Sequence, residues 1–176
     1  MKVIISQTPE QLGRKAAQLA SEYLEEVLSQ KDTARIVVST GASQFDTFEA
    51  LIASDIDWSK IEMFHLDEYV GLPEDHPAGF RKYLKERFVS KVNLKAAHFV
   101  EGTVENLPVI SAELLKAPID LGLIGIGENA HIAFNDPPAD FNTRDPYIIV
   151  DLDENCKKQQ VGEGWFASIE DVPKQA

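Results

Sequence analysis

The sequence contains little cysteine and no long apolar segment. Cys156 is the single cysteine among 176 residues, so an intrachain disulfide is impossible and a zinc site built on several cysteines is excluded. No stretch approaches the roughly 18 consecutive apolar residues of a membrane span, and the apolar run at residues 3–5 is too short for a signal peptide. We therefore expect a cytoplasmic protein that has no membrane partner.

Positive charge is also scarce. Lys and Arg number 17 against 29 Asp and Glu, which gives a net charge of −12. This charge argues against a nucleic-acid partner, because a basic face supplies most of the affinity for nucleic acid. Apolar residues make up 44% of the chain and charged residues 26%, which is a globular balance, and the length suits one domain over residues 1–176.

Short apolar runs alternate with amphipathic stretches along the chain. Thr8, Pro9 and Gln11 form the pattern of a helix start, and apolar residues at spacings of three or four continue it to Gln30. This helix is expected to bury one stripe, formed by Leu12, Ala16, Leu19, Tyr23 and Val27. Further helices are expected at residues 44–54, 77–88, 110–116 and 153–160, and strands at residues 3–5, 35–39, 61–66, 98–100, 119–126 and 147–152. The alternation predicts an α/β fold of three layers, with a Rossmann-like, mostly parallel sheet and helices on both faces.

Residues that follow the strands are the candidates for a site, because ligands of open α/β sheets bind beyond the carboxyl ends of the strands. The first such segment is Ser39-Thr40-Gly41-Ala42-Ser43, of which Thr40, Gly41, Ala42 and Ser43 are the expected phosphate contacts. Its small residues let the backbone approach a ligand, and its hydroxyls and the N–H groups of the next helix can bind a phosphate. The alternative is an ordinary turn before a helix. The lysine and the glycine spacing of nucleotide-binding loops are absent, and we expect no cofactor.

The second segment is Asp67-Glu68, directly after the strand expected at residues 61–66. A carboxylate with limited access to water can have its pKa raised far enough to act as a general base. Because side chains alternate along an extended chain, Asp67 and Glu68 are expected to point in different directions, so that only one reaches a substrate. The alternative is a solvated loop. His65, in the strand itself, is interpreted as a core histidine with a hydrogen-bond partner.

The third segment follows the strand expected at residues 119–126 and contains His131 and Asp136. A histidine near a carboxylate can transfer protons near neutral pH, and the alternative is a histidine packed in a loop. No second histidine lies at ligand spacing from His131, so no metal site is expected. Together the three segments suit proton transfer on a small phosphorylated carbonyl compound, anchored by residues 40–43 and enolised by the carboxylate.

Two of these segments resemble the signature sequences of a known family. Residues 67–72, Asp-Glu-Tyr-Val-Gly-Leu, and residues 125–137, Gly-Ile-Gly-Glu-Asn-Ala-His-Ile-Ala-Phe-Asn-Asp-Pro, are similar to those of the glucosamine-6-phosphate deaminases (isomerising). Residues 40–43 are similar to the phosphate loop of that family, and the resemblance spans nearly the whole chain. The related 6-phosphogluconolactonases share the fold but usually lack both segments in this form.

The resemblance implies an isomerising deaminase, formally a hydrolase, that converts glucosamine 6-phosphate and water into fructose 6-phosphate and ammonia. It implies that Asp67 carries a proton from C2 to C1 and that His131 assists opening of the pyranose ring, with Asp136 as its acidic partner. The implied partner is an amino-sugar phosphate, and a homo-oligomer is compatible with the sequence. The expected substrate and phosphate contacts are Thr40, Gly41, Ala42, Ser43 and Glu68.

The sequence departs from the family pattern at two positions. Asn129 stands where many members have a carboxylate, so it is expected to orient His131 by a hydrogen bond but not to stabilise the imidazolium by charge. Gln160 stands near the position of a phosphate-binding arginine, and either Lys157 or Lys158 replaces that arginine or nothing does. Members of the family also continue beyond the end of this chain, so we expect the domain to lack its C-terminal elements.

Two other functions compete with the deaminase. A 6-phosphogluconolactonase-like hydrolase needs a hydrolytic histidine but no enolising carboxylate, so release of ammonia from glucosamine 6-phosphate distinguishes the two enzymes. A non-catalytic sugar-phosphate-binding module is favoured by Asn129, Gln160 and the short length. Such a module would bind fructose 6-phosphate without turning over the amino sugar.

Overall fold

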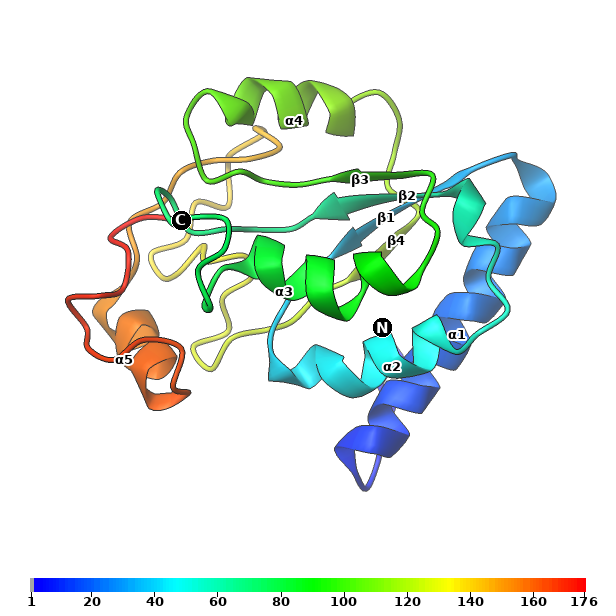
Figure 1. The fold of residues 1–176 in the computed structure, drawn as a ribbon, viewed down its shortest axis with the longest axis horizontal. Coiled ribbons are helices and arrows are strands. Elements are labelled where there is room, and N and C mark those ends of the chain that lie inside the picture. Colours follow the sequence, from blue (N-terminus) through cyan, green and yellow to red (C-terminus); the bar gives the residue numbers. More distant parts are fainter. Residues whose placement is uncertain (1) are drawn as a thin grey trace.

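The computed structural model describes residues 2–176, and its centre is a four-stranded parallel sheet. The strands are β1 (Ala34–Val38), β2 (Ile61–His65), β3 (Ala96–His98) and β4 (Leu121–Leu123), in the order β3-β2-β1-β4. All neighbouring strands run parallel, so their carboxyl ends lie along one edge of the sheet (Figure 1). The predicted α/β fold with a Rossmann-like parallel sheet is confirmed.

Helices cover both faces of this sheet. Helix α4 (Asn106–Leu114) lies on one side, and α2 (Phe45–Ile52) and α3 (Phe80–Arg87) lie on the other, with α1 (Pro9–Gln30) packed against α2 (Figure 1). Helix α5 (Glu154–Gly162) lies beyond the carboxyl ends of the strands, and single 3-10 turns occur at residues 42–44, 58–60 and 89–91. Among the helices of residues 2–176, none combines the length and the apolar character needed to cross a membrane.

Helix α1 begins as predicted but buries a different face. The Thr8 hydroxyl accepts a hydrogen bond from the backbone N–H of Gln11 at 3.2 Å, which caps the helix. The buried residues are small, because α1 packs closely on α2: a Cβ atom added at Gly13 would lie 2.5 Å from the backbone of Asp46. The prediction of the apolar stripe was therefore wrong at Leu12, Leu19 and Tyr23, whereas Ala16 is partly buried and Val27 packs against the core. The buried face consists of Gly13, Ala17, Ala20 and Leu24, whereas Leu12, Leu19 and Tyr23 are exposed.

Two of the expected strands do not form. Residues 3–5 adopt no regular structure, and Val3 and Ile5 are exposed. Residues 147–152 contribute only an isolated bridge between Asp151 and Gln175. An apolar run becomes a strand only where a neighbour completes its backbone hydrogen bonds, and neither segment pairs with a strand of this sheet. Strand β4 is correspondingly shorter than residues 119–126, while β3 and α4 begin two and four residues earlier than predicted, at Ala96 and Asn106.

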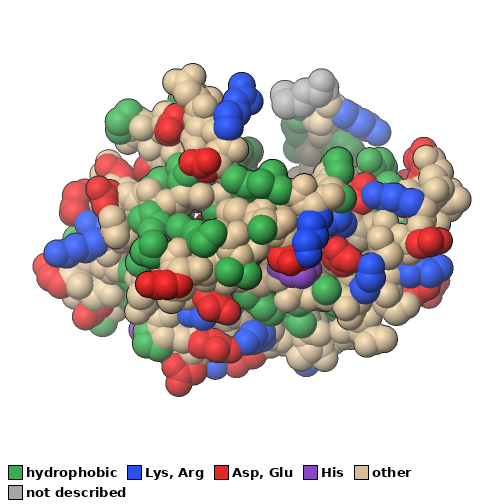
Figure 2. Space-filling view, turned by 90° about the horizontal axis from the view of Figure 1, so that it is seen from above, with side chains coloured by type: hydrophobic (Ala, Val, Ile, Leu, Met, Phe, Trp, Pro, Cys, Tyr) green, Lys and Arg blue, Asp and Glu red, His purple; other side chains and the backbone are tan. Residues whose placement is uncertain are grey.

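The side of the molecule that carries α4 presents apolar surface to solvent. Val104, Val109 and Leu115, on and next to α4, are exposed. Figure 2 views the molecule from this side and shows hydrophobic side chains gathered near the middle of the face, with acidic side chains around them. Small apolar patches are normal on folded proteins, so whether the chain forms a homo-oligomer stays a prediction.

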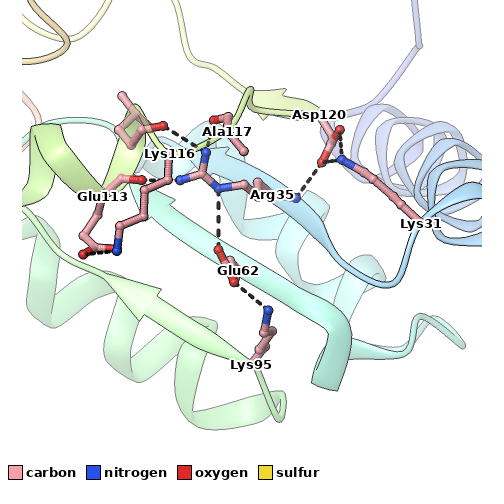
Figure 3. A network of polar contacts seen from close by, with 9 residues as sticks. Lys31, Arg35, Glu62, Lys95, Glu113, Lys116, Ala117 and Asp120 are labelled. Carbon is pink, nitrogen blue, oxygen red and sulfur yellow. Dashed lines mark hydrogen bonds and ion pairs between the residues drawn. The ribbon is translucent and has the colours of Figure 1, made fainter.

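A buried arginine anchors α4 at the amino end of the sheet (Figure 3). Arg35, in β1, is only 5% exposed, and its guanidinium lies 3.5 Å from the carboxylate of Glu62 in β2. The same guanidinium donates hydrogen bonds to three carbonyl oxygens at the C-terminal end of α4, those of Glu113, Leu114 and Ala117. Carbonyls at a helix end lack partners within the helix, so Arg35 satisfies them and holds α4 on the sheet. This network lies at the opposite end of the strands from the candidate site.

Candidate active site

The three segments singled out in the sequence meet at one cavity of about 520 Å³. The cavity lies at the carboxyl ends of β1, β2 and β4, and its wall includes residues 39–43, Asp67 and His131. Residues 159, 160, 163 and 165, at the end of α5 and just beyond it, close another side. The candidate catalytic groups are therefore brought together by the parallel sheet, as the positions after the strands predicted.

Hydrogen bonds from other segments fix the 40–43 loop and the adjoining Ser39 at the wall of the cavity. Gly41 has a φ of 107°, a conformation that glycine adopts without strain, and its carbonyl accepts a hydrogen bond from the Tyr83 hydroxyl at 2.9 Å. The Ser39 hydroxyl oxygen accepts a hydrogen bond from the backbone N–H of Gly125 at 2.9 Å, which links the end of β1 to the segment after β4. All four residues of the loop line the cavity. Sequence reasoning placed Ser39 in this segment but gave it no role of its own, and it missed Tyr83 at the site, because both roles depend on contacts between distant segments.

Asp67 is the carboxylate that faces the cavity. Its surroundings are largely protein, and this burial, together with the negative charge of Glu68, raises the pKa of Asp67 to about 7. A carboxyl group with such a pKa exchanges a proton readily near neutral pH, which is the property that a general base requires.

Glu68 points away from the cavity and caps α3. Its side chain is 1% exposed, and its oxygens accept hydrogen bonds from the backbone N–H groups of Tyr69, Phe80 and Arg81 at 2.9, 3.2 and 2.8 Å. The guanidinium of Arg81 lies 3.4 Å away. The prediction that only one of the two adjacent carboxylates faces the site is therefore confirmed. The structure gives Glu68 a place in the scaffold and not in the wall of the cavity.

His65 is a core residue, as predicted, but without the expected partner. It is fully buried in β2, and burial lowers its pKa to about 3, so the ring is neutral at ordinary pH. Neither ring nitrogen has a hydrogen-bond partner among residues 2–176. The ring packs edge-on against Phe99, with centroids 6.0 Å apart.

His131 is oriented by two polar side chains. Its Nδ1 atom lies 2.7 Å from Asp136 Oδ1 and 2.5 Å from Asn129 Oδ1, and the Asn129 amide donates a hydrogen bond to Asp136 Oδ1 at 2.8 Å. Because the Nδ1 edge of the ring faces these partners, Nε2 is the nitrogen available to the cavity. An Nδ1–H group that donates to a carboxylate leaves Nε2 as an acceptor, which is the arrangement of a histidine general base. The predicted pairing of His131 with Asp136 and Asn129 is present.

A tight turn places the His131 ring. The backbone N–H of Gly127 donates to the His131 carbonyl, and that of Ala130 donates to the Gly127 carbonyl, both at 2.9 Å. A Cβ atom at Gly127 would lie 2.3–2.7 Å from atoms of the His131 ring, so glycine is required there. Ala130 has a φ of 67°, a left-handed conformation that costs a residue with a Cβ atom roughly 1–2 kcal/mol. The turn that positions His131 therefore contains a strained backbone conformation at Ala130.

Helix α5 brings no lysine to the cavity. Gln160 is buried in the wall, where its side-chain oxygen accepts a hydrogen bond from the Tyr69 hydroxyl at 2.8 Å. Lys158 is exposed and lies outside the lining, and Lys157 pairs with Glu154 at 2.9 Å. Among the described lining residues the charged groups are carboxylates, including Glu163, and there is no Lys or Arg. Sequence reasoning missed the wall formed by Glu163 and its neighbours because it follows a helix and not a strand.

Comparisons with known proteins identify the family of the chain. The profile of a family described as "Glucosamine-6-phosphate isomerases/6-phosphogluconolactonase" matches residues 7–160. A glucosamine-6-phosphate deaminase of Pseudarthrobacter chlorophenolicus is 33% identical over 171 residues, covering 92% of this chain and 64% of the relative. A glucosamine-6-phosphate deaminase of Streptococcus pneumoniae is 32% identical, covering 100% of this chain and 73% of the relative. The chain thus spans about two thirds to three quarters of the length of these curated relatives.

Solved structures give the same result. A monomeric glucosamine-6-phosphate deaminase superposes with a TM-score of 0.85 at 29% identity, covering 99% of this chain and 74% of that protein. A 6-phosphogluconolactonase from Thermotoga maritima superposes with a TM-score of 0.69 at 19% identity, covering 81% of this chain and 68% of that protein, which shows a shared fold only. The deaminases are therefore the nearer of these two groups in sequence and in structure. The chain belongs to the family of glucosamine-6-phosphate isomerases and 6-phosphogluconolactonases, as its signature segments predicted.

Proposed function

We propose that this chain isomerises and deaminates an amino-sugar 6-phosphate, converting glucosamine 6-phosphate and water into fructose 6-phosphate and ammonia. One observation carries the proposal: a carboxyl group with a pKa near 7, a histidine aligned by a carboxylate, and a loop suited to phosphate line the same cavity. The family relationship to named deaminases supports the same reaction.

The reaction is divided between two groups. His131 Nε2 accepts the proton of the anomeric hydroxyl and returns a proton to the ring oxygen, which opens the pyranose ring to the aldehyde. Asp67, as the carboxylate, removes the proton from C2 and delivers it to C1. A proton also passes from the amino nitrogen to the C1 oxygen, so that C1 becomes a hydroxymethyl carbon and C2 becomes the carbon of an imine that carries the former amino nitrogen. Water adds to C2 and ammonia leaves, so the atoms balance.

Residues 40–43 bind the phosphate in this proposal. The N–H groups of Gln44 and Phe45 already donate to the carbonyls of Gly41 and Ala42. The donors proposed for the phosphate are therefore the N–H groups of Ala42 and Ser43 and the hydroxyls of Thr40 and Ser43, all in residues that line the cavity. Binding here relies on neutral donors, because the described lining contains no Lys or Arg.

The decisive experiment is an ammonia assay on this chain, run beside a chain extended at its C-terminus. Ammonia released from glucosamine 6-phosphate supports the proposal. Hydrolysis of 6-phosphogluconolactone without ammonia release would support the lactonase instead. Calorimetric binding of fructose 6-phosphate, but not of fructose, without turnover by either chain would identify a non-catalytic binding module.

The role of His131 is tested by a second comparison. The variant His131→Gln should slow turnover of the closed-ring sugar more than turnover of an open-chain aldehyde substrate, because only the closed ring needs opening. Equal impairment with both substrates would assign His131 to the proton transfer at carbon or to positioning. Normal turnover of both would leave His131 as a packed loop histidine.

A further inference from the structure

Three potential metal ligands from distant parts of the chain meet beside the cavity. A ring nitrogen of His131, a carboxylate oxygen of Asp136 and Cys156 Sγ all lie within 4.8 Å of one another, and Nδ1 is the His131 nitrogen that faces Asp136, 2.7 Å from its Oδ1. Imidazole, carboxylate and thiolate are the three types of side chain that bind zinc in proteins. Ligand atoms at 2.0–2.3 Å from a tetrahedral ion are roughly 3.3–3.6 Å apart. To hold an ion, the widest pairs of the cluster must close by about 1 Å, and the hydrogen bond between His131 Nδ1 and Asp136 Oδ1, 2.7 Å long, must open.

A second observation points to a cation at this place. The Asp136 side chain is 4% exposed, and its Oδ2 atom is buried without a hydrogen-bond partner among residues 2–176. Its other oxygen, Oδ1, is bonded to His131 and Asn129, so Oδ2 is the atom left for another ligand. A buried carboxylate oxygen without a donor is costly, and a metal ion would remove that cost.

The negative charge of the cavity wall also favours a cation. The charged residues of its described wall, apart from His131, are Asp67, Glu128 and Glu163, all acidic. A concave site with carboxylates of one sign raises the local concentration of cations. The net charge of −12 over the whole chain acts in the same direction.

We propose that His131, Asp136 and Cys156 form a binding site for a divalent transition-metal ion such as Zn²⁺, and that the bound ion inhibits the enzyme. The inhibition rests on the proposed function, whereas the metal binding does not. A water molecule completes four-fold coordination.

Inhibition follows from the tautomer of His131. Without metal, Nδ1 carries the proton and Nε2 accepts one from the substrate. The ion takes the lone pair of Nδ1, so the neutral ring must carry its proton on Nε2 instead. The ring then donates a hydrogen bond where catalysis needs an acceptor. The thiol of Cys156 binds as thiolate and releases one proton to solvent, while the proton of the imidazole moves from one nitrogen to the other, which balances the step.

Cobalt(II) spectroscopy tests the binding directly, in chelator-free buffer. Cys156 is the single cysteine of the chain, so a sulfur-to-cobalt charge-transfer band in the near ultraviolet reports on this site alone. We expect the band at one equivalent of Co²⁺ and its loss on addition of Zn²⁺. Absence of the band in the wild-type protein would overturn the proposal, and this measurement depends on no variant and on no enzymatic activity.

Zinc titration of variants identifies the other ligands. Calorimetry with Zn²⁺ alone should show affinity reduced by about tenfold or more in Asp136→Asn and His131→Gln. The matched control is Asp145→Asn, an exposed aspartate of the same loop region, which should bind Zn²⁺ like the wild type. Equal affinity in all four proteins would overturn the assignment of the ligands.

The inhibition is tested with Cys156→Ser, a residue outside the proposed catalytic groups. This variant should keep its deaminase activity and become less sensitive to Zn²⁺ by about tenfold or more. Unchanged sensitivity would refute inhibition through this site. If the chain bound Co²⁺ through Cys156 but released no ammonia at all, the metal site would stand and the proposed function would fail.

Discussion

Replacing Asp67 with asparagine should abolish catalysis and make the protein more stable at high pH. The wild-type carboxyl has a pKa of about 7, against an ordinary value of 3.8, because it is buried beside Glu68. A difference of about three pKa units corresponds to roughly 4 kcal/mol, at about 1.4 kcal/mol per unit. This energy is the cost of keeping the Asp67 carboxylate charged in the folded protein. Asparagine has a similar shape and no charge, so the variant does not have this cost.

The sign of the pH dependence follows from proton binding. Between about pH 4 and pH 7 the folded protein keeps the proton on Asp67, while the unfolded chain has lost it. The free energy of unfolding of the wild type therefore falls as the pH rises through this window, relative to the variant. Below pH 4 Asp67 does not change the free energy of unfolding, because it is protonated in both states. Above about pH 7 it is charged in both states, and it lowers the free energy of unfolding by the full amount.

Urea unfolding at pH 5 and pH 8 measures the effect. The difference in unfolding free energy between Asp67→Asn and the wild type should widen by about 2–3 kcal/mol from pH 5 to pH 8. Asp145→Asn, at an exposed position, is the control and should follow the wild type at both pH values. Deamination by Asp67→Asn should fall by about 10²–10⁴-fold. A constant difference between variant and wild type at the two pH values would refute the assignment of the raised pKa to Asp67.

Three further predictions concern the scaffold and the phosphate loop. Gly41→Val should weaken binding of fructose 6-phosphate in calorimetry, because valine disfavours a φ of 107° at the loop, whereas Glu10→Gln on α1 should leave the affinity unchanged; equal affinities would exclude the loop. Arg35→Met should lower the free energy of urea unfolding by about 1–3 kcal/mol, because three carbonyl oxygens lose their donor, while Glu62 keeps its ion pair with Lys95. Gly13→Ala should lower the melting temperature despite the better helix propensity of alanine, since overpacking costs about 1–3 kcal/mol, and a higher melting temperature would show that α1 shifts freely on α2.

Local sequence predicted the features that depend on local chemistry. Apolar runs located the central strands, and the rule that ligands bind beyond carboxyl ends placed Asp67 and residues 40–43 correctly in the wall of the cavity. Alternation along the chain was also enough to separate Asp67 from Glu68. The capping role of Glu68 was not predictable, because its N–H partners at Phe80 and Arg81 belong to a helix that begins twelve residues later.

Features that depend on contacts between distant residues could not be predicted from the sequence. The buried face of α1 depends on how closely α2 approaches, and a face that contains Gly13, Ala17 and Ala20 is buried there in place of the more apolar stripe beside it. Residues 3–5 have the composition of a strand but find no partner in this sheet. The proximity of Cys156 to His131 arises because α5 returns to the edge of the site, and spacing in the sequence carries no sign of it.

The hydrogen bonds that the Ser39 hydroxyl accepts determine whether it can donate to or accept from a ligand. A hydroxyl oxygen has two lone pairs and one proton. In Ser39 both lone pairs are occupied, one by the backbone N–H of Gly125 at 2.9 Å and one by the side-chain amide of Gln44 at 3.0 Å. Its proton is therefore the one hydrogen-bonding capacity that it can offer to the cavity whose wall it forms. A hydroxyl constrained in this way can donate a hydrogen bond to a ligand oxygen but cannot accept one from an ammonium or hydroxyl donor, so this part of the wall favours a ligand that presents an acceptor atom.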